Sequence, residues 1–265
     1  MLFALTRSLS PRFADCQLTH LPRVPIDLDR ARAQHDAYEW ALVDLGCTVR
    51  RIDSAPDMAD AVFIEDTAVV LPEGAIIARP GAETRRPEVP AVVDALGRFG
   101  VPQHTLTEPA TLDGGDVLVV GRQVFVGASA RTNAEGFDQV RRLLEPLGYA
   151  VRAVPVRGCL HLKSAVSAVA SDALLINRAW VPAEAFSGFS LIDVDPGEPH
   201  AANALWLAAP EGPALRGGGI VIYPAVFPKT RARLEARGIR VRTVEVGELA
   251  KAEGGVTCCS LIWGR

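Results

Sequence analysis

The sequence predicts an α/β fold in which about five similar units form a closed ring, a five-bladed α/β propeller. Apolar, β-branched segments broken by turn residues recur along the chain, with amphipathic helical segments between them. Polar landmarks recur as well, because Asp66 and Asp116 lie 50 residues apart and Ser164 follows Asp116 by 48. Such a period divides 265 residues into about five units. A closed ring of them would leave no exposed sheet edge.

Five segments are predicted to form strands, most of them as hairpins. All are rich in aliphatic residues, and turn residues divide the longer ones. They are 61–78, 112–127, 161–176, 204–223 and 257–263.

Four segments between them have helical periodicity. They are 28–45, 88–99, 133–147 and 229–237, and a glycine follows each one, at positions 46, 100, 148 and 238. A glycine just past the last apolar position is a typical helix stop. The predicted unit is therefore ββαβ-like, with the order hairpin, helix, strand.

The composition is that of a folded protein with one core. Hydrophobic residues make up 49% of the chain and charged residues 22%, so we expect residues 1–265 to form a single domain. The rival architecture is an open, doubly wound sheet around a nucleotide. That fold requires an early Gly-rich phosphate loop, and no G-x-G-x-x-G follows the first predicted strand, FALTR.

Charge and cysteine content indicate which kinds of partner and which cellular compartment to expect. The net charge is −3 and basic residues are scattered, which argues against nucleic acid. The apolar N-terminal stretch is too short for a signal peptide, and no segment reaches the roughly 18 apolar residues of a membrane span. Five cysteines without framework spacing favour a reducing compartment. We expect a cytoplasmic protein, monomeric or homodimeric, with a small-molecule partner.

Two adjacent cysteines, Cys258 and Cys259, are predicted at the start of the last strand. The flexible pair Gly254–Gly255 precedes them and would let the backbone approach a ligand closely. A thiol at a strand end is well placed for nucleophilic attack. The ordinary alternative is that one or both pack in the core as small apolar groups.

His161 lies in a polar cluster that interrupts an apolar repeat unit, so it is a candidate acid or base. The histidines at 20, 35, 104 and 200 are interpreted as structural. Cys159-x-His161 and Cys258–Cys259 lack the spacing of structural zinc sites, so no native metal is expected. An inhibitory metal on an exposed Cys/His pair remains open.

Two consecutive acids, Glu65 and Asp66, stand within an apolar strand-like pattern. Burial of their charge without a cationic partner would be costly, and a bound guanidinium would be such a partner. The motif Asp113-Gly114-Gly115-Asp116 is by itself only a turn signal.

Five motifs in this order resemble the dimethylarginine dimethylaminohydrolase family across essentially the whole chain. They are Phe63-Ile64-Glu65-Asp66, Leu112-Asp113-Gly114-Gly115-Asp116, Arg131-Thr132-Asn133, His161-Leu162-Lys163-Ser164 and Thr257-Cys258-Cys259-Ser260. The resemblance implies the five-bladed pentein propeller, which agrees with the repeat pattern.

The resemblance also implies a role for each matching residue. Cys258 would be the nucleophile, His161 the general acid and base, and Asp113 the carboxylate that orients His161. The substrate-binding residues would be Asp60, Glu65 and Asp66 on the guanidinium, Phe63 beside it, Arg85 and Arg131 on the α-carboxylate, and the backbone carbonyls of Leu18 and Ala252 on the α-amino group.

The implied reaction is hydrolysis of asymmetric dimethylarginine or monomethylarginine to citrulline and an alkylamine, through a covalent thiouronium on Cys258, without a cofactor. Arginine deiminases and amidinotransferases share the fold and are the main alternative. They typically carry Arg-Asp where this chain has Glu65-Asp66, and His-x-Asp where it has His161-Leu162-Lys163. A non-catalytic pentein that only binds a partner is the alternative of another class.

Overall fold

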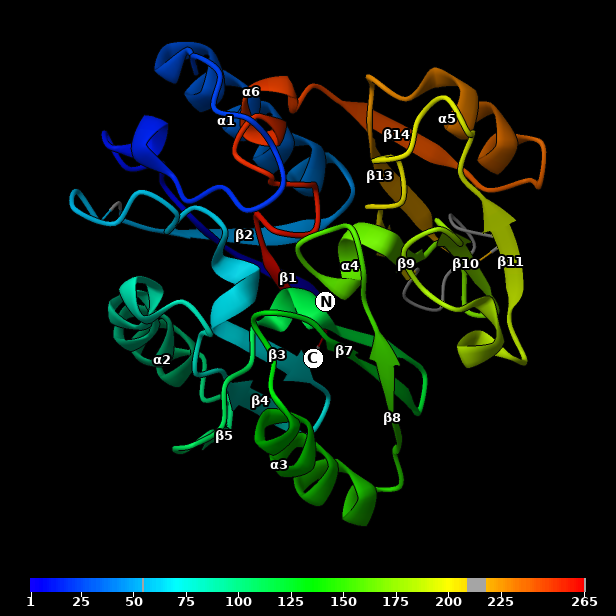
Figure 1. Cartoon of the computed structure of the whole chain (residues 1–265). Coiled ribbons are helices and arrows are strands. Elements are labelled where there is room, and N and C mark those ends of the chain that lie inside the picture. Colours follow the sequence, from blue (N-terminus) through cyan, green and yellow to red (C-terminus); the bar gives the residue numbers. More distant parts are fainter. Residues whose placement is uncertain (54, 209–217, 265) are drawn as a thin grey trace.

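The computed structural model describes residues 1–53, 55–208 and 218–264 as five three-stranded sheets with the longer helices outside them (Figure 1). In spatial order the sheets are β15 (Leu261–Gly264), β1 (Leu2–Arg7), β2 (Cys47–Ile52); β3 (Ala68–Leu71), β4 (Gly74–Ile77), β5 (Gln103–Thr105); β6 (Val117–Val120), β7 (Gln123–Ala128), β8 (Ala150–Pro155); β9 (Val166–Ala168), β10 (Ala173–Ile176), β11 (Ser190–Asp193); and β12 (Leu205–Leu207), β13 (Ile220–Pro224), β14 (Val241–Val244).

Each sheet repeats one pattern, an antiparallel pair followed by a parallel outer strand. A parallel neighbour needs a crossover connection. In four units a helix provides it: α1 (Leu28–Asp44), α2 (Val89–Arg98), α3 (Ala134–Leu144) and α5 (Pro228–Glu235). The β10–β11 connection has a 3-10 turn, Ala183–Phe186, instead. The predicted ββαβ-like unit and its four helices are confirmed; residues 209–217 of the predicted segment 204–223 lie outside the described residues.

Local sequence explains where the helices begin and end. The Asp27 side chain accepts a hydrogen bond from the backbone N–H of Arg30 and caps α1, and Asn133 caps α3 through Gly136. The glycines predicted to stop the helices all have positive φ, namely +88° at Gly46, +65° at Gly100, +83° at Gly148 and +77° at Gly238.

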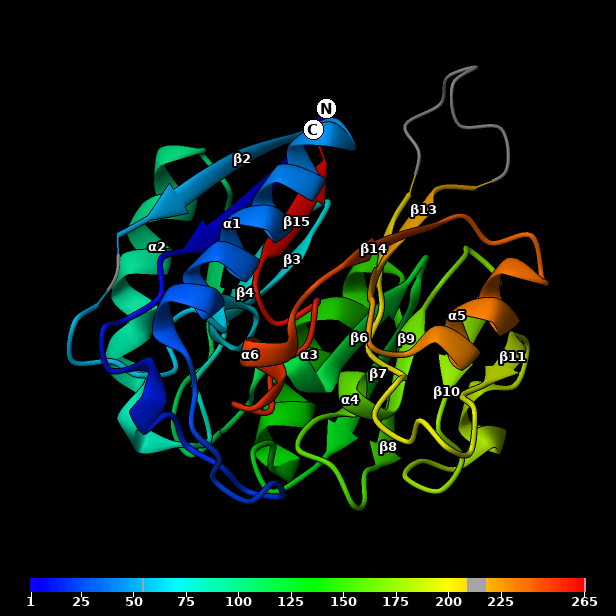
Figure 2. The same ribbon diagram turned by 90° about the horizontal axis from the view of Figure 1, so that it is seen from above.

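Five hydrophobic clusters join the sheets in a ring. Each cluster contains buried side chains from two neighbouring sheets: first with second, second with third, third with fourth, fourth with fifth, and fifth with first. The last of these is built around α1, which lies alongside the short helix α6 (Gly247–Ala250) and close to β14 (Figure 2). Because the fifth cluster returns to the first sheet, the propeller prediction is confirmed.

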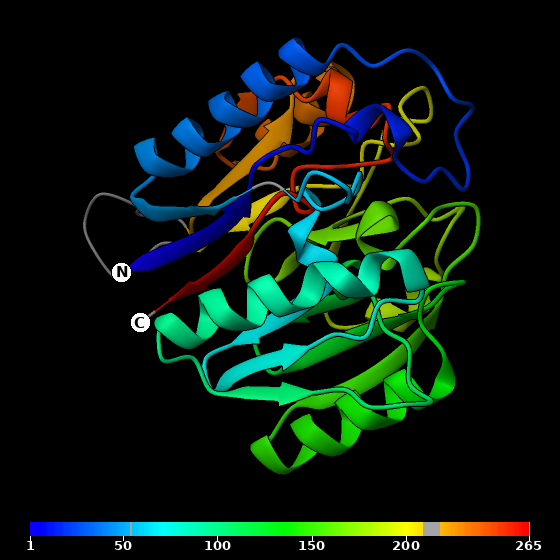
Figure 3. The ribbon, with the colours of Figure 1, turned by 90° about the vertical axis from the view of Figure 1, so that its left-hand side faces the viewer.

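The two ends of the chain complete one sheet. β15 pairs antiparallel with β1 in the register Leu2 to Gly264 and Leu5 to Leu261. Figure 3 shows these strands side by side with both termini at the same edge. Cys258 lies three residues before β15, so it is held at one end of this closing sheet. None of the helices in residues 1–53, 55–208 and 218–264 has the length and apolar character that a bilayer crossing requires.

Candidate active site

The candidate residues lie in short turns that precede the inner strands of the ring. Ile64–Thr67 and Gly114–Asp116 are 3-10 turns before β3 and β6, and His161 precedes the one-turn helix α4 (Leu162–Ala165) before β9. Cys258 lies in a turn before β15. The sequence prediction that the acids and the cysteines lie within strands is therefore wrong. The turns gather side chains from four units at one end of the inner strands.

These turns and their neighbours enclose a small pocket of about 20 Å³. Its lining includes eight residues singled out from sequence: Asp60, Phe63, Asp66, Arg85, Arg131, His161, Ala252 and Cys258. Asp113 lies directly behind His161, whereas Leu18 and Glu65 are not among the lining residues. The volume is about that of one water molecule.

His161 is held between carboxylates. Its Nε2 lies 3.0 Å from Asp113 Oδ2 and its Nδ1 lies 3.7 Å from Asp66 Oδ1. Asp113 is itself fixed, because its Oδ1 accepts a hydrogen bond of 2.9 Å from the backbone N–H of Gly81. Burial alone would lower the pKa of His161, but Asp66, Asp113 and Asp116 together raise the pKa to about 9. At neutral pH this histidine is an imidazolium that can donate a proton.

Asp66 interacts with three groups from other segments of the chain. It accepts hydrogen bonds from the backbone N–H of Gly115 and from Arg85, and it faces His161. Burial would raise the pKa of Asp66, but His161 and Arg85 outweigh it and lower the pKa to about 2. A carboxylate ionised over the whole physiological range is suited to a cationic ligand.

Arg85 is buried and engaged within the protein. Its guanidinium donates to the carboxylates of Asp66 and Glu88 and to the carbonyls of Asp60 and Phe63. From sequence we expected a bound guanidinium to neutralise Glu65 and Asp66. For Asp66 the chain itself supplies the cation, which is Arg85. Arg85 was predicted to bind an α-carboxylate. To do so it would have to share N–H groups that already donate to the two carboxylates and the two carbonyls.

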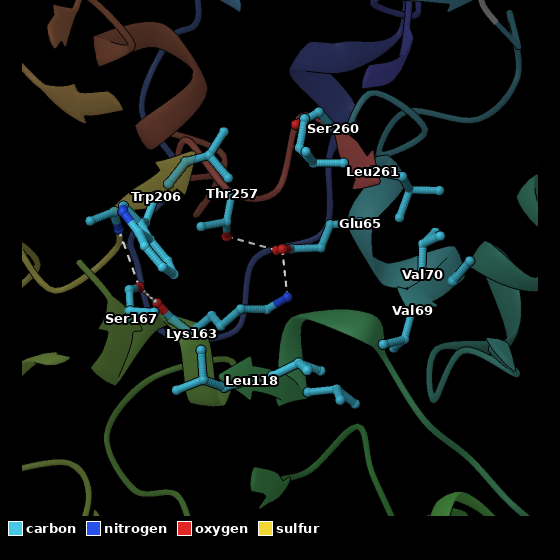
Figure 4. Close-up of a pocket in the computed structure, with 17 residues that line it drawn as sticks. Glu65, Val69, Val70, Leu118, Lys163, Ser167, Trp206, Thr257, Ser260 and Leu261 are labelled. Atoms are coloured by element: carbon cyan, nitrogen blue, oxygen red, sulfur yellow. Dashed lines mark hydrogen bonds and ion pairs between the residues drawn. The ribbon is translucent and has the colours of Figure 1, made fainter. Parts of the chain in front are cut away.

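Glu65 points away from the pocket. Its carboxylate accepts hydrogen bonds from Lys163 Nζ (2.5 Å) and Thr257 Oγ1 (2.7 Å), and it lines a second cavity of about 200 Å³ (Figure 4). All five inner strands line that cavity, so it is the centre of the ring. From sequence, Glu65 was expected to bind a guanidinium in the pocket. In the structure its side chain lies on the other side of the turn, where it is hydrogen-bonded to Lys163.

The three candidate thiols differ in exposure and surroundings. Cys258 is partly exposed and lines the pocket, and its Sγ accepts a hydrogen bond of 3.3 Å from the backbone N–H of Gly255. Cys259 is fully buried in the cluster between the first and fifth sheets. Cys159 lines a neighbouring cavity and donates to the carbonyl of His161. Burial, with Glu65 and Asp66, raises the pKa of Cys258 to about 12, so without a ligand Cys258 is a neutral thiol.

The outer rim of the pocket is formed by the side chain of Arg131 and by a main-chain segment, residues 18–21, which we call the strap. Arg131 is half-buried, and within the described residues its guanidinium donates one side-chain hydrogen bond, to Thr19 Oγ1 at 3.5 Å. Glu253 Oε1 accepts hydrogen bonds from the backbone N–H groups of residues 19–21. Leu18 lies in this strap, and its neighbour Gln17 lines the pocket.

Asp66, Asp113 and His161 also form a group that could hold a metal, with ligand atoms within 4.8 Å of one another. A metal there would have to displace the proton that the three nearby carboxylates stabilise on His161. Within the described residues, neither Cys159 nor Cys258 belongs to a group of three or more potential ligands of this kind.

Several contributors were missed from sequence. Glu88 binds Arg85, Glu253 binds the strap, and Asp116 accepts hydrogen bonds from Ser129, Thr132 and the Leu162 N–H to anchor the His161 segment. These partners lie up to 234 residues apart in the chain. Of the three acids Glu88, Glu253 and Asp116, only Asp116 carried a sequence signal, as part of the motif Asp113-Gly114-Gly115-Asp116, and that signal did not indicate its partners.

Comparison with known proteins agrees with this geometry. The family model "N,N dimethylarginine dimethylhydrolase, eukaryotic" matches residues 23–262. The N(G),N(G)-dimethylarginine dimethylaminohydrolase of Streptomyces coelicolor is 42% identical over 262 residues, covering 97% of this chain and 95% of the relative. This chain belongs to the dimethylarginine dimethylaminohydrolase family.

Solved structures of the family superpose closely. DDAH from Pseudomonas aeruginosa, as a cysteine-to-serine mutant complexed with citrulline, has a TM-score of 0.89 at 32% identity and covers 98% of both chains. A histidine-to-glycine dimethylarginine dimethylaminohydrolase, as an adduct with S-methyl-L-thiocitrulline, also has a TM-score of 0.89 at 32% identity and covers 99% of this chain and 100% of the other.

Proposed function

We propose that this protein hydrolyses asymmetric dimethylarginine and monomethylarginine to citrulline, releasing dimethylamine or methylamine. The observation that carries the proposal is the convergence of Cys258, His161 and Asp66 on one pocket. The family relatives complexed with citrulline and S-methyl-L-thiocitrulline support the same class of substrate.

The residues suit each step of this reaction. A guanidinium is a poor electrophile, so Asp60 and Asp66 would orient it while Cys258 attacks its central carbon. The substrate cation would also offset the negative charges that keep Cys258 protonated, so the thiol would lose its proton to solvent when substrate binds and would attack as the thiolate. His161, already protonated, would donate to the departing amine and then, as a base, take a proton from water that releases citrulline. Asp113 would keep the imidazole in place throughout.

We propose that the other end of the substrate binds at the rim. Arg131 is free to pair with an α-carboxylate, and Ala252 and the strap containing Leu18 would receive the α-amino group. Phe63 supplies an apolar wall, since its ring packs edge-on against Phe13 with centroids 5.7 Å apart. Gly254 allows this, because a Cβ there would come within 2.2 Å of the ring.

Arginine deiminase activity is the second candidate. Two motif differences argued against it from sequence. The position of Glu65 removes the first, which treated Glu65 as a guanidinium ligand, but the second, His161-Leu162-Lys163 in place of His-x-Asp, still holds. The methylated substrate is also supported by the limited set of acceptors: Arg85 and His161 already occupy Asp66, and Asp60 accepts from the backbone of Gln17. A fully unmethylated guanidinium would bring more donors than these carboxylates can accept.

The test is citrulline formation by the purified protein from four compounds: arginine and its monomethyl, asymmetric dimethyl and symmetric dimethyl derivatives. We expect the highest kcat/KM for the asymmetric dimethyl and monomethyl compounds, and no turnover by Cys258→Ser. Cys259→Ser is the matched control and should keep most activity. A clear preference for arginine would assign the chain to the deiminases.

Two further proposals concern the whole protein. The shared cores of the five sheets support one domain over residues 1–265. All five cysteines are free thiols in the structure, which supports a cytoplasmic location. A monomer or homodimer without nucleic-acid partners remains our expectation, and size-exclusion chromatography with light scattering would test the oligomeric state.

A further inference from the structure

Asn203 stands before the inner strand β12, at the place that holds candidate catalytic residues in the other four units. Asp66, Asp113, His161 and Cys258 lie a few residues ahead of β3, β6, β9 and β15. Asn203 lies two residues ahead of β12 and is 8% exposed. Nothing in the sequence pattern singled it out, and it does not line the pocket that holds Cys258.

The Asn203 amide joins the segment of His161 to the segment of Cys258. Its Nδ2 donates to the carbonyl of Lys163 (3.1 Å) and to Thr257 Oγ1 (2.9 Å). Its Oδ1 accepts from the backbone N–H of Thr257 (3.1 Å). Lys163 is two residues after His161, and Thr257 directly precedes Cys258. One side chain thus spans the two elements that must meet for catalysis.

The polarity of this network is fixed by its partners. A carbonyl can only accept and a backbone N–H can only donate, so the amide has one possible orientation. The Thr257 hydroxyl accepts from Asn203 and therefore donates its own proton to Glu65, which also receives Lys163 (Figure 4). Every polar atom of the amide is paired, which makes the arrangement rigid.

The turn around Cys258 is shaped to fit this amide. A Cβ on Gly255 would lie 2.4 Å from Asn203 Oδ1, so only glycine permits the approach. The same Gly255 donates its N–H to Cys258 Sγ and accepts from the Cys258 N–H. A further backbone bond, from Glu65 N–H to the carbonyl of Cys258, ties the turn to the neighbouring unit.

We propose that Asn203 is a positioning residue for the reaction proposed above: it holds the turn that carries Cys258 at a fixed place relative to the segment that carries His161. The amide touches no substrate. It acts through Thr257 and Lys163. Its loss would increase the distance between the Cys258 thiol and the His161 imidazole, while the groups that bind substrate keep their positions.

The test compares Asn203→Ala with wild type in steady-state hydrolysis of asymmetric dimethylarginine. Displacement of a reacting group by about 1 Å can cost about 100-fold in rate. We therefore expect kcat to fall about 10- to 100-fold while KM stays within about threefold. A role in folding alone would instead lower the fraction of active protein and leave kcat per folded molecule unchanged.

Asn177→Ala is the matched control. Asn177 is 6% exposed, donates through Nδ2 to the carbonyl of Pro199 and accepts from the N–H of Ala179, so it bonds to neither catalytic segment through its side chain. We expect it to lower the melting temperature without changing kcat. Equal loss of kcat in both variants would overturn the positioning role.

If Asn203→Ala does not fold, Thr257 gives a second test of the same network. Thr257→Val removes the hydroxyl and should lower kcat, whereas Thr257→Ser keeps it and should restore kcat to near the wild-type value. Wild-type kcat in a folded Asn203→Ala or Thr257→Val protein would overturn the positioning role alone. Absence of citrulline formation by wild type would overturn the proposed function and this role with it.

Discussion

Glu65 and Asp66 are consecutive carboxylates that face two different cavities. Asp66 lines the small charged pocket with His161 and Cys258, and Glu65 lines the larger cavity inside the ring with Lys163 and Thr257. Both are buried, and each has a cation from within the chain as its partner. The 3-10 turn Ile64–Thr67 separates them, because successive side chains in such a turn point in different directions. Adjacency in sequence therefore does not imply a shared role.

The largest effect that tests this difference is on catalysis. Asp66→Asn should lower kcat/KM at least about 100-fold, since it removes a charge-assisted contact to the substrate and a neighbour of His161. Glu65→Gln should act mainly on kcat, by about 10-fold, through Thr257 and the Cys258 turn. Steady-state kinetics of both variants is the measurement. A larger rise in KM for Glu65→Gln than for Asp66→Asn would reverse the assignment.

A second contrast is between two arginines, Arg131 at the rim of the pocket and the buried Arg85. Arg131→Ala should raise KM about 10-fold and leave kcat and thermal stability nearly unchanged, because its guanidinium has few partners in the protein. Arg85→Ala should lower the melting temperature, because it leaves Asp66 and Glu88 buried without their cation. Thermal melts and kinetics of both variants would show this. Equal loss of stability would contradict the distinction.

The smallest expected effect is on the pKa of Cys258, which Glu65 and Asp66 shift in the same direction. After burial, Glu65 and then Asp66 are the largest causes that raise the pKa of Cys258 to about 12. Neutralising either one lowers that pKa, so the thiolate forms at lower pH. The pH midpoint of inactivation by neutral iodoacetamide should therefore shift downward in Glu65→Gln and in Asp66→Asn. An unchanged midpoint in both would show that these charges do not reach the thiol.

Much of the fold could be predicted from local sequence, because the stop glycines, the helix caps and the apolar segments act on residues close in the chain. Cys258 and His161 were also identified, since their chemistry stands out from apolar surroundings. The direction of Glu65, the partners of Arg85 and the role of Asn203 depend on contacts between units and on the turn geometry. No local pattern reports which of two buried acids meets Lys163 and which meets Arg85.

We expect the covalent intermediate to form on Cys258 with the assistance of His161. Mass spectrometry of His161→Gly after incubation with S-methyl-L-thiocitrulline tests this, because loss of the acid and base should slow release. We expect a stable mass increment that fragmentation places on Cys258 and that Cys258→Ser in the same background abolishes. An increment on Cys259 or Cys159 instead would contradict the assignment of the nucleophile.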